Sequence, residues 1–248
     1  MKIATWNVNG IRARHEQFAQ WVAAEQPDVI CLQEIKAKLD QIPQTCSIEG
    51  YTCYWHGAGG YSGVAMHVRR AFASEPAFTH PDFDHETRIV QTQIEDTVFT
   101  SVYVPNGGKD FEAKIAFINA MIGYAAGLRE RGLKLVLCGD MNIARSEMDV
   151  HPKERKPRAI GQLPQERELF ERLLHEGGLV DVGRQLYPDD DNYFSWWAPW
   201  RSMKERNIGW RLDYVLASES LAKSAVSCPS QREIGTSDHA PVVATFDI

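Results

Sequence analysis

Hydrophobic segments with the spacing of strands and helices alternate along the whole chain. Short apolar or β-branched runs predict strands at residues 3–8, 29–32, 51–55, 63–68, 89–94, 98–104, 133–138, 212–217 and 241–246. Apolar residues spaced three and four apart predict helices at residues 11–26, at 111–131 and from about 164 to 177. This alternation predicts an α/β fold, and the closely spaced strands of the middle third are expected to pair antiparallel.

Polar residues gather at one end of many of these strands. The clusters are Asn7 with Asn9, Gln33 with Glu34, Tyr103 with Asn106, Asp140 with Asn142, Asp213 alone, and Asp238 with His239. A single cluster is typical of a strand that leaves the core, but six strand ends along one edge would form a concave site on rigid elements. Acids, amides and one histidine in such a site favour a metal-assisted reaction.

The length and composition fit one globular domain. Of the 248 residues, 44% are hydrophobic and 24% are charged, which excludes disordered and coiled-coil proteins. No low-complexity linker divides the chain, so we expect a single catalytic domain over residues 1–248. Five cysteines without a Cys-x-x-Cys pair argue against a disulfide framework or a zinc ribbon and favour the reducing cytoplasm.

Charge and hydropathy limit the possible partners. No segment is apolar over the roughly 20 residues that a membrane span requires, and no signal sequence is recognisable, so we expect a soluble cytoplasmic monomer with no membrane partner. The net charge of −6, taken alone, disfavours a nucleic-acid partner. A metal site needs clustered carboxylates, however, so the placement of the charges matters more than their sum.

Six short motifs follow one another at the polar strand ends. They are W-N-V-N-G at residues 6–10, L-Q-E at 32–34, Y-V-P-N at 103–106, G-D-M-N at 139–142, G-W-R-L-D-Y at 209–214 and S-D-H-A-P at 237–241. Their order resembles the exonuclease III family of apurinic/apyrimidinic (AP) endonucleases, within the endonuclease/exonuclease/phosphatase superfamily. The resemblance implies a DNase I-like four-layer αββα sandwich, with two packed mixed sheets flanked by helices.

The resemblance also implies a chemical activity. Members of the family are Mg²⁺-dependent hydrolases, with Mn²⁺ as a substitute, that cleave double-stranded DNA 5′ to an abasic site and leave a 3′-hydroxyl. The same site is expected to process damaged 3′ ends as a 3′-5′ exonuclease or 3′-phosphodiesterase. General base catalysis accelerates a reaction only about 10²- to 10⁴-fold. Phosphodiester hydrolysis demands far more, so a metal ion and orientation must supply the rest.

Catalytic roles follow from the resemblance. Asp140 is expected to orient or deprotonate the attacking water, and Asn142 to donate to the phosphate or to position Asp140. Tyr103 is expected to donate its hydroxyl to the phosphate or the leaving group. His239 is expected to donate to a non-bridging oxygen, with Asp213 as the buried carboxylate that keeps the imidazole protonated near neutral pH.

A second set of residues is expected around the metal. Glu34 is the expected direct ligand of Mg²⁺, because a hard cation prefers carboxylate oxygens and water. Asn7 and Asn9 lie two apart on an extended segment, so they face the same side and are expected to arrange metal-bound water. Members of the family often carry Asp at the position of Asn9. The other residues expected near the metal are Asp238, Asp140 and Asn142.

A segment rich in tryptophan and cations is expected to receive the DNA. Trp196, Trp197, Trp200 and Trp210 are interleaved with Arg201, Lys204, Arg206 and Arg211. Aromatic rings among cations suit an abasic deoxyribose and its flanking phosphates, although a core role remains open for Trp197. The resemblance makes Trp196 and Trp210 the pocket walls. Further DNA contacts are expected from Asn106, Lys109, Lys153, Arg155, Lys156 and Arg158.

Two other functions remain open. One is a phosphoesterase of the same superfamily that acts on another substrate, such as a phosphoinositide or sphingomyelin; the basic loop at residues 151–158 favours DNA over these. The other is a non-catalytic nucleic-acid-binding regulator on the same scaffold. Such a regulator is expected to have lost acidic or histidine residues of the site, and this chain retains them.

Overall fold

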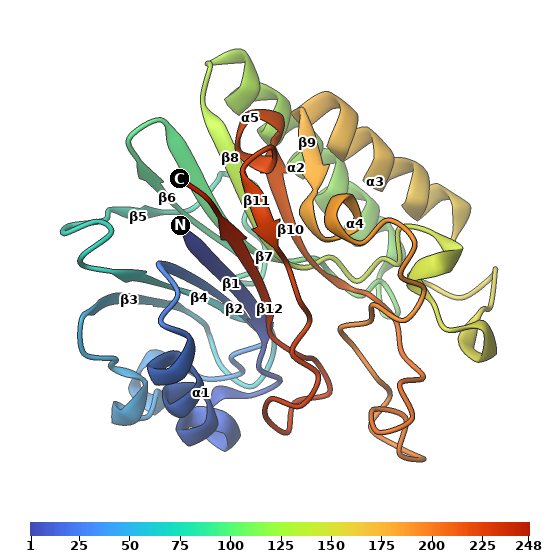
Figure 1. The fold of residues 1–248 in the computed structure, drawn as a ribbon, viewed down its shortest axis with the longest axis horizontal. Coiled ribbons are helices and arrows are strands. Elements are labelled where there is room, and N and C mark those ends of the chain that lie inside the picture. Colours follow the sequence, from blue (N-terminus) through green and yellow to red (C-terminus); the bar gives the residue numbers. More distant parts are fainter.

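Two six-stranded mixed sheets pack face to face in the computed structural model, which describes residues 1–248 (Figure 1). In spatial order, the first sheet contains β11 (Ala225–Ser227), β12 (Val242–Phe246), β1 (Lys2–Asn7), β2 (Val29–Gln33), β4 (Val64–Arg69) and β3 (Tyr51–His56). The second contains β5 (Phe78–Thr79), β6 (Ile89–Ile94), β7 (Thr97–Tyr103), β8 (Lys134–Asp140), β10 (Asp213–Ser218) and β9 (Leu179–Asp181).

Helices cover the outer faces of the two sheets. Helix α1 (Ile11–Glu25) packs its apolar side on the first sheet, and α2 (Phe111–Glu130) with α3 (Pro164–Gly177) packs on the second. The short elements are α4 (Val182–Leu186), α5 (Glu219–Ala222) and four 3-10 turns at Leu39–Gln41, Gln44–Cys46, Glu147–Asp149 and Pro152–Glu154. None of the helices is both long and apolar enough to cross a membrane.

Three apolar layers stabilise this arrangement. The layer between the sheets contains Ile3, Met66, Phe99, Val136 and Val215, all of them buried. The two outer layers lie under α1 and under the α2–α3 pair. The expected four-layer sandwich is therefore confirmed.

The sequence pattern predicted most of these elements. Each of the nine predicted strands and three predicted helices has a counterpart within a few residues. The middle strands pair antiparallel as expected, but β3 with β4 and β6 with β7 belong to different sheets. The elements that the pattern missed are β5, β9, β11, α4 and α5, each of five residues or fewer.

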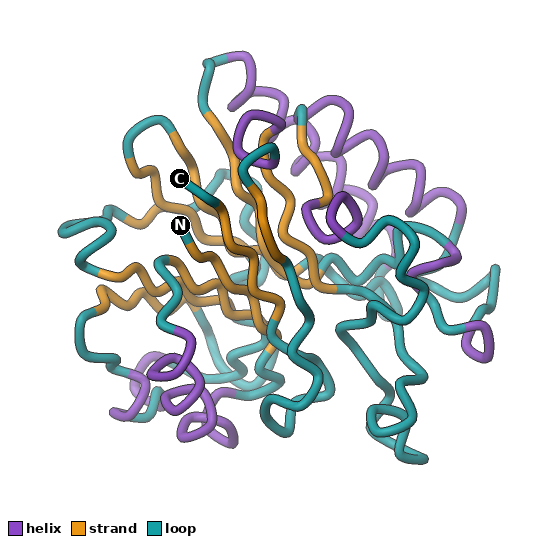
Figure 2. The backbone as a smooth tube through the Cα atoms, viewed as in Figure 1, coloured by secondary structure: helices purple, strands orange, loops and turns teal.

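The parallel pairs determine where the polar strand ends lie. Strands β1 and β2 run parallel with Asn7 opposite Gln33, and β7 and β8 run parallel with Tyr103 opposite Asp140. Antiparallel β10 begins with Asp213 opposite Asp140. Long loops leave both sheets at this same end of the molecule (Figure 2). The strand ends of the two sheets therefore meet at one edge of the sandwich.

Gly139 allows β8 to approach β7 closely just before Asp140. Its φ is +155°, and a β-carbon at this position would lie 1.8 Å from the carbonyl oxygen of Val102. We expect Gly139→Ala to lower the free energy of unfolding by about 3 kcal/mol, because the strands would have to separate. Urea denaturation measures this loss. Gly123→Ala, in an open position of α2, is the control and should raise stability by about 0.5–1 kcal/mol; equal effects of the two changes would contradict the interpretation.

A buried ion pair joins α2 to α3 beneath the strand ends. Lys114 and Glu166 are both fully buried, and the Lys114 ammonium also donates to the carbonyl oxygens of Asn106 at 3.2 Å and Asn142 at 2.9 Å. Glu166 accepts from the backbone N–H groups of Gly161 and Leu163. The pair therefore fixes the loops after β7 and β8.

Removal of one partner of this pair should be strongly destabilising. We expect Lys114→Met to lower the free energy of unfolding by about 3–5 kcal/mol, because the Glu166 charge would remain buried without its partner. Urea denaturation is the measurement. The control is Lys134→Met, which breaks the exposed pair with Asp96 and should cost less than about 1 kcal/mol. A small loss in both variants would be the contrary result.

Candidate active site

Asp140 lies at the centre of the meeting strand ends and is almost fully buried. Its Oδ1 accepts from the backbone N–H of Asn142 at 2.8 Å, and its Oδ2 accepts from Nδ2 of Asn7 at 2.9 Å. The same Asn7 amide donates to Oε1 of Glu34 at 3.0 Å. One asparagine of the first sheet thus connects a carboxylate of each sheet.

His239 and Asp213 form a buried pair beside Asp140. Nδ1 of the imidazole lies 2.8 Å from Oδ2 of Asp213, and Nε2 lies 3.9 Å from Oδ2 of Asp140. The Ser195 hydroxyl donates to the same Asp213 oxygen at 2.7 Å and accepts from the backbone N–H groups of residues 212 and 213. Asp213 is therefore oriented, and the Nε2 side of the imidazole faces Asp140.

The burial and charge of these groups shift their pKa values. Burial lowers the pKa of His239, but the charges of Asp213 and Asp140 outweigh it and raise that pKa to about 10. Burial raises the pKa of Asp140 to about 7, against the opposing charge of His239. Burial and the carboxylates of Glu34 and Asp140 raise the pKa of the Tyr103 phenol above its ordinary value. His239 is therefore cationic and Tyr103 neutral at pH 7.

Glu34 and its neighbours already hold a cation. The Lys36 ammonium lies 2.5 Å from Oε2 of Glu34 and 2.7 Å from Oδ1 of Asn9. Ligand atoms of Glu34, Asp140 and His239 lie within 4.8 Å of one another. A carboxylate and an amide oxygen that hold an ammonium form a donor set that fits a hard divalent cation, since such ions prefer oxygen ligands. The residues present thus fit a metal ion.

Asp238 is connected to this group through Asn9. Its Oδ1 accepts from Nδ2 of Asn9 at 2.7 Å, and its Oδ2 accepts from the indole N–H of Trp196 at 3.1 Å. Both carboxylate oxygens are therefore used, and the group of ligand atoms around Glu34 does not include Asp238. In this arrangement Asp238 orients Asn9 and Trp196.

Two tryptophans line the side of the site next to His239. The rings of Trp196 and Trp210 meet edge to face with centroids 5.6 Å apart, and Trp196 lies 6.4 Å from the His239 ring. Nε1 of Trp210 is buried without a hydrogen-bond partner. Trp197 is instead packed in a small core cluster with Phe194 and has the core role that the sequence left open.

The backbone of the site is strained. Asn9, Glu34, Lys36 and Asn142 have φ between 43° and 51°, a region that side chains other than glycine adopt at a cost of order 1–3 kcal/mol each. The dense hydrogen bonding around them keeps these residues there. Strain of this kind is typical of functional sites.

Cationic side chains surround the site at its rim. Lys109, Lys153, Arg155, Lys156 and Arg158 are exposed. Asn106 is exposed as well and donates to Oδ1 of Asn142 at 3.1 Å. The loop at residues 151–158 lies beside the tryptophans, because Val150 pairs with Trp210 and the N–H of His151 donates to the carbonyl of Gly209 at 2.9 Å. The structure thus places Asn106 and the loop at residues 151–158 beside the site.

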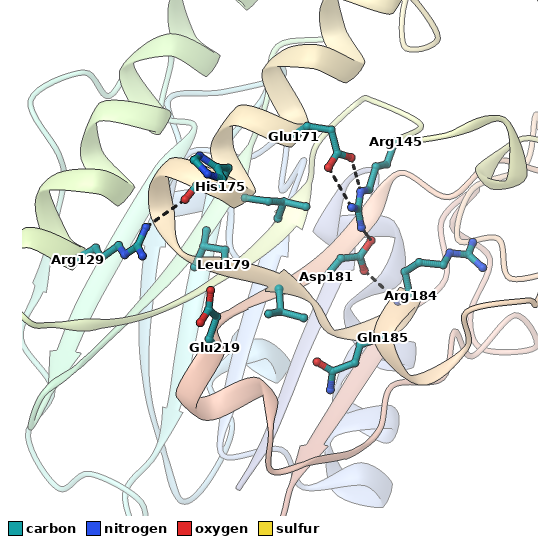
Figure 3. A pocket seen from close by; sticks show the side chains of 11 residues that line it. Arg129, Arg145, Glu171, His175, Leu179, Asp181, Arg184, Gln185 and Glu219 are labelled. Atoms are coloured by element: carbon teal, nitrogen blue, oxygen red, sulfur yellow. Dashed lines mark hydrogen bonds and ion pairs between the residues drawn. The ribbon is translucent and has the colours of Figure 1, made fainter.

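Arg211 is one of the cations that the sequence pattern placed among the tryptophans, but it is not available to bind a DNA phosphate. Its guanidinium is buried and forms a two-pronged pair with Asp181 at 2.7–2.8 Å and a third bond with Asp149 at 2.7 Å. Arg145 also donates to Asp181 at 3.3 Å and to Glu171 at 2.6 Å (Figure 3). This network fixes the segment that carries Trp210 and Asp213, so Arg211 positions the site from beneath.

The sequence did not indicate several residues that shape the site. Lys36 lies two residues after Glu34, but both residues have positive φ, so the alternation of side chains along a strand could not have placed them together. Arg88 lies with its guanidinium 4.7 Å from the Tyr103 ring centroid. Neither Ser195 nor Arg88 belongs to a recognisable pattern, because their partners are far away in the sequence.

Proteins of similar sequence and fold include nucleases. Residues 4–239 match the model of the Endonuclease/Exonuclease/phosphatase family. The exodeoxyribonuclease of Bacillus subtilis is 35% identical over 261 residues, which cover 100% of both chains. An AP endonuclease from Archaeoglobus fulgidus and a 3′-5′ exonuclease from Neisseria meningitidis superpose with TM-scores of 0.90, at 29% and 32% identity over 100% of each chain. The chain therefore belongs to the endonuclease/exonuclease/phosphatase family.

Proposed function

We propose that this protein is a Mg²⁺-dependent DNA repair phosphodiesterase that cleaves the backbone 5′ to abasic sites and leaves a 3′-hydroxyl. It also acts at 3′ ends as a 3′-5′ exonuclease or 3′-phosphodiesterase. The observation that carries the proposal is the buried Asp140, held between Asn7 of one sheet and the His239–Asp213 pair. Similarity to both an AP endonuclease and a 3′-5′ exonuclease supports the two activities.

The residues around Glu34 would hold the metal ion. Glu34 and Asp140 would be its carboxylate ligands, Asn7 and Asn142 would orient these carboxylates, and Asp238 would orient Asn9 beside them. When bound, the ion supplies positive charge that stabilises the negative charge developing on the phosphate. Mg²⁺ is favoured over softer ions because these donors are oxygen atoms, and Mn²⁺ shares that preference.

Three side chains accept or donate protons in the proposed reaction. Asp140, whose burial and neighbouring carboxylates favour its protonated form, accepts a proton from the attacking water. Protonated His239 donates from Nε2 to a non-bridging phosphate oxygen, since its Nδ1 is engaged by Asp213. The neutral phenol of Tyr103 donates to the phosphate or to the leaving 3′-oxygen. Asn142, which is bonded to Asp140 and Asn106, keeps the carboxylate in place.

The substrate is double-stranded DNA with an abasic site or a damaged 3′ end. Trp196 and Trp210 form the walls that receive the deoxyribose. The rim residues contact the backbone phosphates; they are Asn106, Lys109, Lys153, Arg155, Lys156 and Arg158. Because both sheets contribute catalytic residues, residues 1–248 act as one catalytic domain. We further propose a cytoplasmic monomer, and the five free cysteines support the reducing compartment.

Cleavage of a labelled duplex that contains one tetrahydrofuran abasic analogue tests the proposal. The analogue cannot undergo β-elimination, so a cut means hydrolysis. We expect a cut immediately 5′ to the analogue with Mg²⁺ and none with EDTA. An intact recessed duplex measures the accompanying 3′-exonuclease. Binding without cleavage would favour a regulator, and neither binding nor cleavage would favour another phosphoester substrate.

Asp140→Asn should abolish turnover while DNA binding persists. The amide cannot accept a proton from water, so we expect kcat to fall by a factor of at least about 10³. Affinity for the tetrahydrofuran duplex, measured by fluorescence anisotropy, should change less than about threefold, because Asp140 lies beneath the phosphate contacts. A matching loss of binding would show that its role is misassigned.

Glu34→Ala should raise the Mg²⁺ concentration that gives half-maximal cleavage. We expect at least a tenfold increase, because the main oxygen ligand is lost. A titration of activity with Mg²⁺ gives this value. Glu49→Ala, at an exposed position, is the control and should leave the titration unchanged. The assignment fails if the metal requirement of Glu34→Ala equals that of the unchanged protein.

A further inference from the structure

A second group of metal-binding side chains lies outside the catalytic site. His56 is the last residue of β3, His80 follows β5, and Asp84 lies in the turn before β6. One ligand atom from each residue lies within 4.8 Å of the other two. The imidazole rings of His56 and His80 stack with centroids 3.8 Å apart. The group is partly exposed, so an ion can reach it.

His80 is held with one nitrogen free to bind an ion. Its Nδ1 lies 2.9 Å from the carbonyl oxygen of Ile89. Since a carbonyl can only accept, Nδ1 carries the proton, and Nε2 of the neutral ring presents a lone pair. That nitrogen lies 2.9 Å from the hydroxyl of Tyr54, which can donate to it or turn away. A backbone carbonyl on the far nitrogen is the usual support for a metal-binding histidine.

Asp84 is oriented in a similar way. Its Oδ1 accepts from the backbone N–H groups of Arg88 at 2.9 Å and Ile89 at 3.1 Å. Its Oδ2 lies 2.5 Å from Nε2 of His56. The contact with His56 and the backbone bonds lower the pKa of Asp84 against the effect of its burial. A charged oxygen and two imidazole nitrogens therefore face the same space.

We propose that His56, His80 and Asp84 bind a first-row divalent cation such as Zn²⁺, with water completing the shell. Two imidazoles and one carboxylate match the ligands that Zn²⁺ prefers, whereas the oxygen donors of the catalytic group favour Mg²⁺. A tetrahedral ion requires ligand atoms roughly 3.3 Å apart. The ligand atoms now lie within 4.8 Å of one another, and the stacked imidazole rings must turn so that both nitrogen lone pairs face the ion, which would replace the proton between His56 and Asp84.

The position of His56, His80 and Asp84 would let a bound ion cross-link the two sheets. Strand β3 is an edge of the first sheet and β5 an edge of the second. An ion bound by His56 and His80 therefore joins the open edges of the two sheets. Asp84 is also bonded to the backbone of Arg88, whose guanidinium lies 4.7 Å from the Tyr103 ring centroid. The cross-link thus supports one wall of the catalytic site.

Metal titration of the full-length protein, stripped with a chelator, tests the site. Zn²⁺ is measured by competition with a chromophoric chelator, and Co²⁺ by its visible absorption. We expect one Zn²⁺ per chain, a tetrahedral Co²⁺ spectrum, and a rise in the thermal midpoint with Zn²⁺. His80→Gln and Asp84→Asn should each weaken Zn²⁺ binding at least tenfold and remove the thermal shift.

Two further variants distinguish this site from the alternatives. His85→Gln changes an exposed histidine of the same turn, and Glu34→Gln changes the catalytic group; both should bind Zn²⁺ as the unchanged protein does. Retention of binding in both His80→Gln and Asp84→Asn would overturn the proposal, as would the absence of binding in the unchanged protein. Loss of binding in Glu34→Gln alone would place the ion at the catalytic carboxylates and would also overturn it.

Discussion

The charge of His239, maintained by its buried pair with Asp213, is the feature on which the rest of the site depends. Burial alone would lower the imidazole pKa, and the neighbouring carboxylates raise it to about 10. In return, the imidazolium 3.9 Å from Asp140 opposes the rise in the pKa of that acid. Without this cation, the carboxylates of Glu34, Asp140, Asp213 and Asp238 would lie together, and Lys36 pairs with Glu34 alone. The packing of the sheets at this edge therefore requires a charged histidine.

The fold holds the His239–Asp213 pair from both sheets. His239 lies just before β12 of the first sheet, and Asp213 begins β10 of the second. Arg211, two residues before Asp213, is anchored beneath the site by two buried carboxylates, so the approach to β10 is rigid. The hydrogen bonds that close the sandwich at this end are thus the same bonds that orient the catalytic groups, and stability and geometry cannot be separated here.

Sequence periodicity predicted the layers and the meeting of polar strand ends, because both follow from runs of β-branched residues long enough to show a pattern. The edge strand Phe78–Thr79 has two residues and cannot display a period. The residues of the site also divide into those with a local sequence signal and those without one. Motifs predicted that Asp140 and His239 lie at the polar strand ends, whereas the sequence did not reveal the partners of Arg211, because residue type does not show acids that lie 62 and 30 positions away. Ser195, which is bonded to Asp213, lacks any local signal for the same reason.

The balance of charge in the site would couple the proposed divalent ion to the proposed base, Asp140. The four carboxylates Glu34, Asp140, Asp213 and Asp238 outnumber Lys36 and His239, the two cations that lie within ion-pair distance of them. The uncompensated charge of the neighbouring carboxylates adds to burial in raising the pKa of Asp140 to about 7. A divalent cation beside Glu34 would neutralise this excess and lower that pKa. Under the proposed function, the strength of Asp140 as a base would depend on the occupancy of the metal site, so the two could not be tuned independently.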